Sequence, residues 1–260
     1  MLDLFPSREV LLSIGPLSVH WYGVMYAIAF LLGLFLLRRL LPYRSLLLSK
    51  QQIDKLFVWI VLGVVLGGRL GFVLFYGDAS YLSEPLRILA AWEGGMSSHG
   101  GFIGVTIALL LFCRRNKVSL LSLTDVLVVP IALGLMLGRI GNLINGELFG
   151  TVTSVPWAMS FPHAEGLRHP TQIYATLKDL FIALVCFGHL RMTAKTEKPG
   201  GTTATFLLLY GLLRFCLEYF REQSYAGTEL AGVILSRGQL LTLPILLLGV
   251  AVFLWSRRKA

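Results

Sequence analysis

Seven stretches of mostly apolar residues, each about 20 residues long, follow one another along this chain of 260 residues. A helix that crosses the hydrocarbon core of a bilayer needs about 20 such residues. Charged residues make up only 14% of the chain, whereas soluble domains carry about 25%. We therefore predict an all-α integral membrane protein with about seven transmembrane helices. The predicted spans are residues 20–38, 55–76, 97–113, 121–144, 171–190, 201–221 and 239–256.

The loops between the predicted spans are short, and no low-complexity linker or solenoid repeat interrupts the series. We expect residues 1–260 to form a single polytopic membrane domain, with a small region at the outer face around residues 145–170. Cys113, Cys186 and Cys216 all fall in predicted spans and match no zinc-binding spacing. The sequence therefore predicts neither a disulfide framework nor a metal site.

Lys and Arg are distributed unevenly between the two sets of loops that flank the predicted spans. One set carries fourteen: Arg38, Arg39, Arg44, Lys50, Lys55, Arg114, Arg115, Lys117, Arg191, Lys195, Lys198, Arg257, Arg258 and Lys259. The other set carries four: Arg8, Arg87, Arg168 and Arg237. Because cytoplasmic loops are rich in Lys and Arg, we expect the N-terminus outside and the C-terminus in the cytoplasm. The net charge of +9 is then mostly an orientation signal, and it requires no nucleic acid partner.

Five further basic residues lie within or at the ends of predicted spans: Arg69, Arg139, Lys178, Arg214 and Arg221. A charge at the centre of a transmembrane helix costs about 2.5 to 3.5 kcal/mol on insertion scales, and a leucine returns only about 0.5 kcal/mol. Such residues are therefore expected near an interface or against a partner. With the predicted orientation, the four arginines fall toward the outer ends of their spans. The inner halves are almost free of charge, except for Asp125, which we interpret as a helix-start residue or a packing partner.

Other polar residues fall in the same outer layer. Tyr22 begins the first span and His99 the third, while Asn142 and Glu147 follow Arg139 in the stretch GRIGNLINGELFG. One face of the sixth span carries four polar residues at helical spacing, Tyr210, Arg214, Glu218 and Arg221. Taken singly, each is equally compatible with a structural role, because Arg and Tyr anchor helix ends at the membrane interface. Together they leave a positive surplus at headgroup depth. Since guanidinium groups match phosphate oxygens, the pattern indicates binding of an anionic phospholipid in the outer leaflet.

Glycines are concentrated near these charges, including the series Gly63, Gly67 and Gly71 and the pair Gly100 and Gly101. Small residues at this spacing indicate close helix packing or close approach of the backbone to a headgroup, and both interpretations stay open. No nucleophile motif such as G-x-S-x-G is present. If the protein is an enzyme, its nucleophile therefore arrives with a second substrate. A neutral imidazole at His99 is suited to act as a base, although a lone histidine is more often structural.

Six motifs in this sequence together resemble those of bacterial prolipoprotein diacylglyceryl transferases. They are HWYGVMY, GGRLGFVLFY, HGGFIG, GRIGNLINGELFG, HPTQIY and YGLLRFCLEYFRE, and they cover nearly the whole chain in the family's order. GRIGNLINGELFG is highly specific, whereas HGG alone would be weak. The resemblance implies a multi-pass enzyme of the bacterial cytoplasmic (inner) membrane whose site faces the outer leaflet and needs no cofactor.

The resemblance further implies that the enzyme moves the diacylglyceryl group of phosphatidylglycerol to the lipobox cysteine thiol of preprolipoprotein signal peptides. A thioether forms and glycerol 1-phosphate leaves. By motif, His99, Arg139 and Arg214 are the expected catalytic residues, with the two arginines on the phosphate and His99 as base. The expected substrate-binding residues are Tyr22, Arg69, Gly100, Gly101, Asn142, Glu147, Gly150, Tyr210, Glu218 and Arg221. We expect a monomer among membrane lipids.

Two other functional classes compete with this interpretation. An anionic-lipid transporter or lipid-translocating protein would place broken helices and charges near the bilayer midplane, whereas the charges here favour one leaflet. An intramembrane protease would need a Ser–His dyad or paired aspartates, and the sequence contains no such motif. Ser98 beside His99 is a poor geometry for a dyad.

Overall fold

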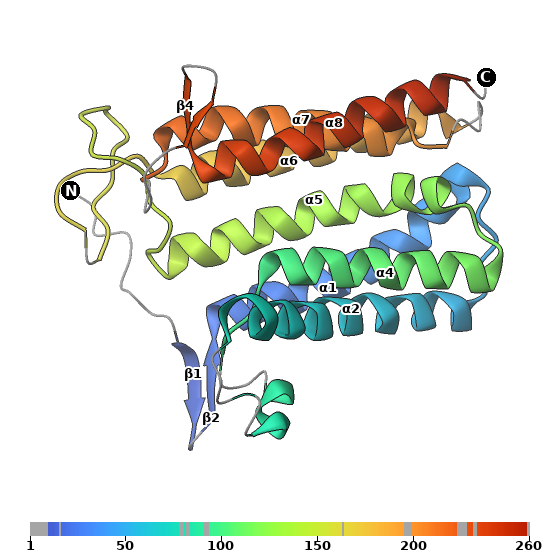
Figure 1. Cartoon of the computed structure of the whole chain (residues 1–260), viewed down its shortest axis with the longest axis horizontal. Helices are drawn as coiled ribbons and strands as arrows, with labels where there is room; N and C mark the ends of the chain where they lie inside the picture. The colour runs from blue at the N-terminus through green and yellow to red at the C-terminus, as the bar shows by residue number, and fades with distance from the viewer. Residues whose placement is uncertain are drawn as a thin grey trace. The chain divides into compact units, whose positions relative to one another are not determined.

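The computed structural model describes residues 10–15, 17–77, 81, 84–90, 94–162, 164–194, 199–222, 228–230 and 233–258, and it is mostly helical (Figure 1). The chain divides into two compact units. One comprises Leu46–Leu123, and the other comprises Met1–Ser45 together with Thr124–Ala260.

The smaller unit is a pair of long helices joined by an irregular segment. Helix α2 (Lys50–Tyr76) begins with a capping box in which Ser49 and Gln52 satisfy each other's backbone N–H groups. The 3₁₀ helix η2 (Pro85–Leu89) follows, and α4 (Ser98–Asn116) begins at a cap where the Ser97 hydroxyl accepts from the N–H of Gly100. Helices α2 and α4 lie side by side (Figure 1).

Glycines line the contact between α2 and α4. A Cβ atom at Gly67 would overlap the carbonyl oxygen of Gly100, and one at Gly104 would overlap the carbonyl oxygen of Gly63. The backbones therefore touch, as in small-xxx-small packing. For Gly63, Gly67, Gly71 and Gly100, the helix-packing interpretation of the sequence is confirmed.

Within its described residues, the larger unit contains five long helices and two short hairpins. The helices are α1 (Trp21–Leu40), α5 (Leu120–Ile144, which starts in the smaller unit), α6 (Thr171–Met192), α7 (Gly201–Leu217) and α8 (Arg237–Arg258). Strands β1 (Val10–Ile14) and β2 (Leu17–His20) pair antiparallel, as do β3 (Thr228–Leu230) and β4 (Val233–Leu235). Helix α7 packs against both α6 and α8 (Figure 1). The 3₁₀ helices η1 (Leu41–Arg44) and η5 (Glu218–Phe220) follow α1 and α7.

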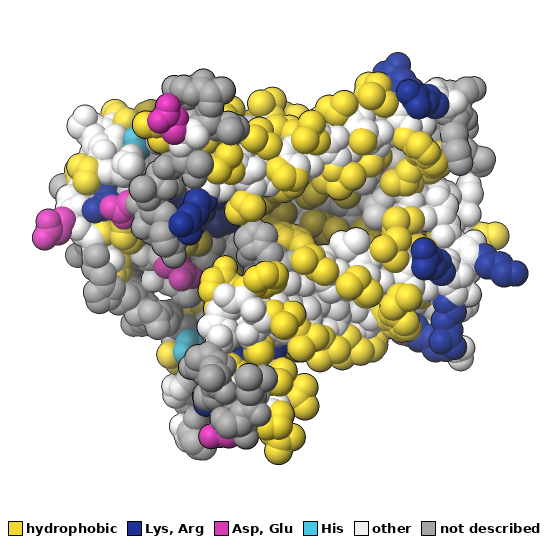
Figure 2. All heavy atoms as spheres, viewed as in Figure 1, with side chains coloured by type: hydrophobic (Ala, Val, Ile, Leu, Met, Phe, Trp, Pro, Cys, Tyr) yellow, Lys and Arg dark blue, Asp and Glu magenta, His cyan; other side chains and the backbone are white. Residues whose placement is uncertain are grey.

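Each predicted span coincides with one long helix, and six of these helices are long and apolar enough to cross a membrane: α1, α2, α5, α6, α7 and α8. Helix α4 is not among the six within the described part of the chain. The two hairpins were not predicted. Large apolar side chains stay exposed along the helices (Figure 2), for example Leu31 at 67%, Leu74 at 77% and Leu247 at 71%. Such extended apolar surface fits a lipid environment and not water.

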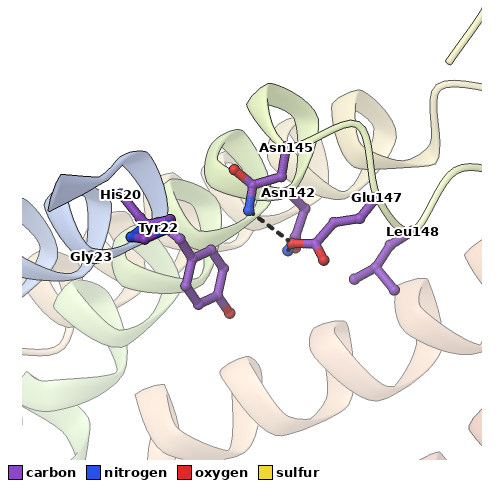
Figure 3. Close-up of a pocket in the computed structure, with 7 residues that line it drawn as sticks. All are labelled: His20, Tyr22, Gly23, Asn142, Asn145, Glu147 and Leu148. Atoms are coloured by element: carbon purple, nitrogen blue, oxygen red, sulfur yellow. Dashed lines mark hydrogen bonds between the residues drawn. The ribbon is translucent and has the colours of Figure 1, made fainter. Parts of the chain in front are cut away.

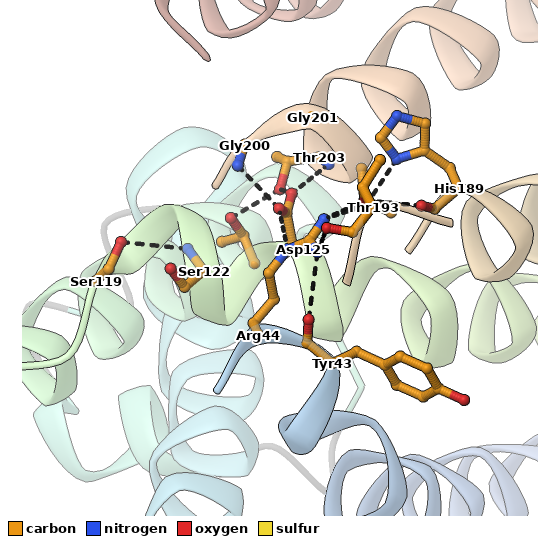
Figure 4. Close-up of polar contacts among 12 residues, drawn as sticks. Tyr43, Arg44, Ser119, Ser122, Asp125, His189, Thr193, Gly200, Gly201 and Thr203 are labelled. Carbon is orange, nitrogen blue, oxygen red and sulfur yellow. Dashed lines mark hydrogen bonds and ion pairs between the residues drawn. The ribbon is translucent and has the colours of Figure 1, made fainter. Parts of the chain in front are cut away.

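A buried ion pair connects α5, α7, the residue that follows α6 and the 3₁₀ helix η1 (Figure 4). Arg44 donates from Nε to Asp125 Oδ2 at 2.8 Å, and both side chains are almost fully buried. The two terminal nitrogens of Arg44 reach the hydroxyls of Thr193 and Thr202 and two backbone carbonyls. Asp125 also accepts from the Thr203 hydroxyl and from two backbone N–H groups. We call these residues the Arg44–Asp125 cluster. Asp125 is therefore a packing partner, and Arg44 is buried instead of being a loop charge.

Candidate functional site

A small cavity in the larger unit is lined by four cationic side chains from four segments. With the solvent at its mouth included, the empty space within it is about 380 Å³, of which water-sized spheres can occupy about 20 Å³. Arg139 lies on α5, Lys178 on α6 and Arg214 on α7, and Arg221 directly follows η5. We call it the basic cavity. Its remaining lining residues are Leu148, Thr171, Gln172, Ala175 and Leu217.

Glu218 lies between two of these arginines. Its carboxylate forms an ion pair with Arg214, one helical turn earlier, and its Oε2 lies 4.0 Å from Nη1 of Arg221. The sequence predicted a helix to residue 221, but α7 ends at Leu217 and η5 follows. Arg221 consequently takes an extended backbone conformation. Burial lowers the pKa of Arg221, and the charge of Arg214 lowers it further.

Gly238, at the start of α8, makes room for Glu218. A Cβ atom at Gly238 would overlap the Glu218 carboxylate. The side chain of Glu218 is only 4% exposed, so the carboxylate has little freedom to move aside. Gly238 was not among the residues expected from the sequence, because a glycine beside a helix start carries no chemical signal of its own.

Lys178 is paired with the adjacent Asp179, and both side chains are buried. Its ammonium nitrogen also lies 4.2 Å from the centroid of the Tyr210 ring, a cation–π distance. Tyr210, expected to bind substrate, thus lies beside one of the cavity's cations. Among the described residues, Asp179 and Glu218 form ion pairs with cations of the cavity. The lining of the basic cavity itself contains four cationic side chains and no carboxylate.

A second, more open pocket lies beside the basic cavity and shares Leu148 with it. It has a volume of about 520 Å³ and is lined by His20, Tyr22, Gly23, Asn142, Asn145, Glu147 and Leu148 (Figure 3). Asn142 and Asn145 both direct amide nitrogens at Glu147 Oε1, at 2.8 and 3.4 Å (Figure 3). Asn142 Oδ1 in turn lies 3.4 Å from Nη1 of Arg139. Asn142 therefore connects the arginine of one cavity to the carboxylate of the other.

The segment after α5 is fastened to the start of α6. Thr171 donates its hydroxyl to the carbonyl of Leu148 at 2.8 Å, and Gln172 donates its amide to the carbonyl of Glu147 at 2.7 Å. Gly150 forms a bridge with Arg221, and a Cβ atom there would collide with His169 and with the Phe220 carbonyl. Gly150 thus contacts the backbone of the segment that carries Arg221. Gln172 was missed by sequence reasoning, although the HPTQIY motif contains it.

The remaining expected site residues belong to the smaller unit. Arg69 is 3% exposed, and its guanidinium donates to the carbonyls of Arg87, Ile88, Gly94 and Gly95. It therefore holds together the segment that leads to α4, and its role in substrate binding stays a prediction. Gly100 is packed against α2, whereas a Cβ atom at Gly101 would meet only an ordinary contact. His99 is the second residue of α4, and its side chain lies outside the described residues.

The larger unit thus brings together Tyr22, Arg139, Asn142, Glu147, Gly150, Tyr210, Arg214, Glu218 and Arg221 around the two adjacent cavities. Among the described residues, no group of three or more His, Cys, Asp or Glu side chains could hold a metal ion. The chemical capacity of this arrangement is to hold an anion with guanidinium groups beside a pocket that contains a carboxylate and two amides.

A family model described as prolipoprotein diacylglyceryl transferase matches residues 9–255 of the chain. Several curated proteins named phosphatidylglycerol–prolipoprotein diacylglyceryl transferase are similar over almost their whole length. The Nitrosomonas europaea protein is 44% identical, covering 96% of this chain and 90% of its own. The Rhodospirillum rubrum protein is also 44% identical, covering 98% of this chain and 94% of its own.

Proposed function

The chain belongs to the prolipoprotein diacylglyceryl transferase family, and from this membership we propose that it transfers the diacylglyceryl group of phosphatidylglycerol to the lipobox cysteine of preprolipoproteins. The observation that carries this proposal is the cluster of four cationic side chains that lines the basic cavity. The phosphate diester of phosphatidylglycerol is an anion of the kind that such a cluster would bind.

In the proposed reaction, the cysteine sulfur attacks the glyceryl carbon that carries the phosphate oxygen. The carbon–sulfur bond forms as the carbon–oxygen bond breaks, and the electron pair leaves with glycerol 1-phosphate. Negative charge therefore grows on the phosphate in the transition state. In our proposal Arg139 and Arg214 stabilise that charge from two helices, and preorganised donors of this kind supply much of the rate enhancement in enzymes.

The thiol must also lose its proton, and His99 is our candidate base. A free thiol has a pKa of about 8.5, so modest assistance suffices. In our proposal Tyr22, Asn142 and Glu147 form the neighbouring pocket for the acceptor and glyceryl groups, while Glu218 orients Arg214 and Arg221. Asn142 contacts both Arg139 and Glu147. It would therefore hold the phosphate-binding arginine at a fixed position relative to the neighbouring pocket.

The proposed function is tested with purified protein, phosphatidylglycerol and a peptide that contains a lipobox cysteine. We expect the peptide to gain the mass of one diacylglyceryl group while glycerol phosphate is released. A peptide with Cys→Ser is the control and should gain nothing. Lipid binding without transfer to the cysteine peptide would contradict the proposal and favour a lipid-handling protein.

We also propose that α4 spans the membrane as a seventh helix, with the N-terminus outside, the C-terminus in the cytoplasm and the site facing the outer leaflet of a bacterial inner membrane. The support is the Lys and Arg distribution and the tight packing of α4 on α2. Single cysteines placed at Gly94 and Lys117, on either side of α4, should react with an impermeant thiol reagent from opposite faces of oriented vesicles. Labelling from one face alone would contradict the seven-span arrangement.

A further inference from the structure

One buried amide in the basic cavity has a hydrogen-bonding capacity that the protein itself does not use. Gln172 is 2% exposed, and its Nε2 donates to the carbonyl oxygen of Glu147 at 2.7 Å. A carbonyl oxygen can only accept, so the amide nitrogen must be on that side. This fixes Oε1 on the other side, where it has no hydrogen-bond partner among the described residues.

An acceptor left in this state is costly. Burying a polar atom without a partner costs about 1 to 3 kcal/mol, and native proteins satisfy the large majority of such atoms. Gln172 lines the basic cavity together with Arg139, Lys178 and Arg214. A donor on a molecule bound in this cavity would supply the missing bond.

A phospholipid headgroup can present only a few kinds of group to this acceptor. Phosphate diester oxygens carry no hydrogen, so the phosphate that the arginines attract cannot satisfy Gln172. An ammonium group is a donor, but its positive charge would be repelled by the four cationic side chains that line the same cavity. A hydroxyl is neutral and donates one hydrogen bond. The cavity is therefore complementary to an anionic phosphate that has a hydroxyl close by.

We propose that Gln172 is a specificity-determining residue that accepts a hydrogen bond from a headgroup hydroxyl of the lipid substrate. The inference rests on the proposed function, because it takes the arginine-bound anion to be the phosphate of phosphatidylglycerol. Gln172 then distinguishes a glycerol headgroup from one that lacks hydroxyls, while the arginines recognise only the phosphate. Its hydrogen bond to the Glu147 carbonyl positions the acceptor before the lipid enters.

The test compares two lipids with identical acyl chains, phosphatidylglycerol and phosphatidylpropanol, whose headgroup has no hydroxyl. Transfer rates to the lipobox peptide are measured for the unsubstituted protein, Gln172→Met and Gln172→Leu. We expect both variants to lose about tenfold with phosphatidylglycerol, roughly the contribution of one hydrogen bond to a transition state. Their rates with phosphatidylpropanol should stay within about twofold of the unsubstituted protein.

Thr176→Val is the matched control. Thr176 lies one turn further along α6, donates its hydroxyl to the Gln172 carbonyl and does not line the cavity. It should leave the ratio of the two lipid rates unchanged. The ratio is taken within each variant, so any loss of folded enzyme cancels.

The possible outcomes distinguish a failure of the proposed role of Gln172 from a failure of the proposed transferase function. A selective loss with phosphatidylglycerol would support the role of Gln172. Equal losses with both lipids would overturn it, because a structural role affects every substrate alike. Equal rates with both lipids in the unsubstituted protein would also overturn it. Transfer from neither lipid would instead defeat the proposed function itself, and the inference with it.

Discussion

Two buried groups of charged residues in the larger unit differ in how far other residues of the protein satisfy them. In the Arg44–Asp125 cluster, one cation faces one anion, and the remaining nitrogens and oxygens of both groups have hydrogen-bond partners. In the basic cavity, four cationic side chains and no carboxylate form the lining, and Gln172 Oε1 has no hydrogen-bond partner among the described residues. Only the first group is complete without a ligand.

The difference shows how a structural charge can be distinguished from a functional one. Burial alone does not separate the two groups, because Asp125 and Glu218 are both buried. What separates them is whether the protein satisfies each group. A closed network rigidifies its surroundings, whereas a cavity lined by charges of one sign is complementary to a ligand of the opposite sign. Substitutions in the two groups should therefore change different measurements.

The largest expected effect is on stability, from Asp125→Ala. This change leaves Arg44 buried without its counter-ion, and removal of one partner of a buried pair costs about 3 to 5 kcal/mol. Denaturant unfolding in detergent should show the loss of stability. The transfer rate per folded enzyme should stay close to that of the unsubstituted protein. A large fall in that rate would mean that the Arg44–Asp125 cluster also serves the reaction.

The next effect is on catalysis, from Arg214→Ala. Loss of a donor that stabilises charge in the transition state typically lowers the rate by about 10² to 10³. The free energy of unfolding should also fall, by about 1 to 3 kcal/mol, because the buried Glu218 carboxylate loses its ion-pair partner and keeps only Arg221 at 4.0 Å. Arg191→Ala, an exposed arginine at the end of α6, is the control and should affect neither quantity. A rate unchanged by Arg214→Ala would remove the centre of the proposed function.

A smaller loss of stability is expected from Thr203→Val. The Thr203 hydroxyl donates to Asp125 Oδ1 at 2.7 Å, and hydrogen bonds to charged groups contribute about 1.5 to 3 kcal/mol. The carboxylate keeps its bonds from Arg44 and from two backbone N–H groups. Unfolding should therefore weaken less than in Asp125→Ala. An equal loss in the two variants would show that the network fails as a unit.

The smallest effect is expected from Arg139→Lys, which keeps the charge but loses the two-pronged geometry that matches phosphate oxygens. We expect the transfer rate to fall about tenfold with unfolding unchanged. Parallel rate measurements on Arg139→Ala provide the reference. If the two substitutions were equally damaging, shape and not charge would be the property that the site requires at this position.

Much of the basic cavity follows from local sequence patterns. The helical spacing of Arg214, Glu218 and Arg221 predicts one face, and the structure has Glu218 near both arginines. The glycine series likewise predicts close packing, which α2 and α4 show. These features depend on neighbours within a few turns, so a single sequence reveals them.

The features that were missed depend on partners far apart in the chain. Arg44 reads as a loop charge because its partner Asp125 lies 81 residues away. Gln172 has no charge, and its importance becomes visible only when the Glu147 carbonyl and the cavity are in place. The 3₁₀ turn at Glu218 ends α7 earlier than its apolar pattern indicates. Tertiary contacts, and not local propensity, decide these cases.

The glycine at position 238 has a consequence for genetics. Any side chain there would enter the space of the Glu218 carboxylate and disturb the acid that Arg214 and Arg221 share. In a selection for growth that depends on this protein, position 238 should accept glycine alone, even though glycine has no group that could react. Intolerance of substitution at this position would reflect the lack of space beside Glu218. It would not indicate that residue 238 takes part in the reaction.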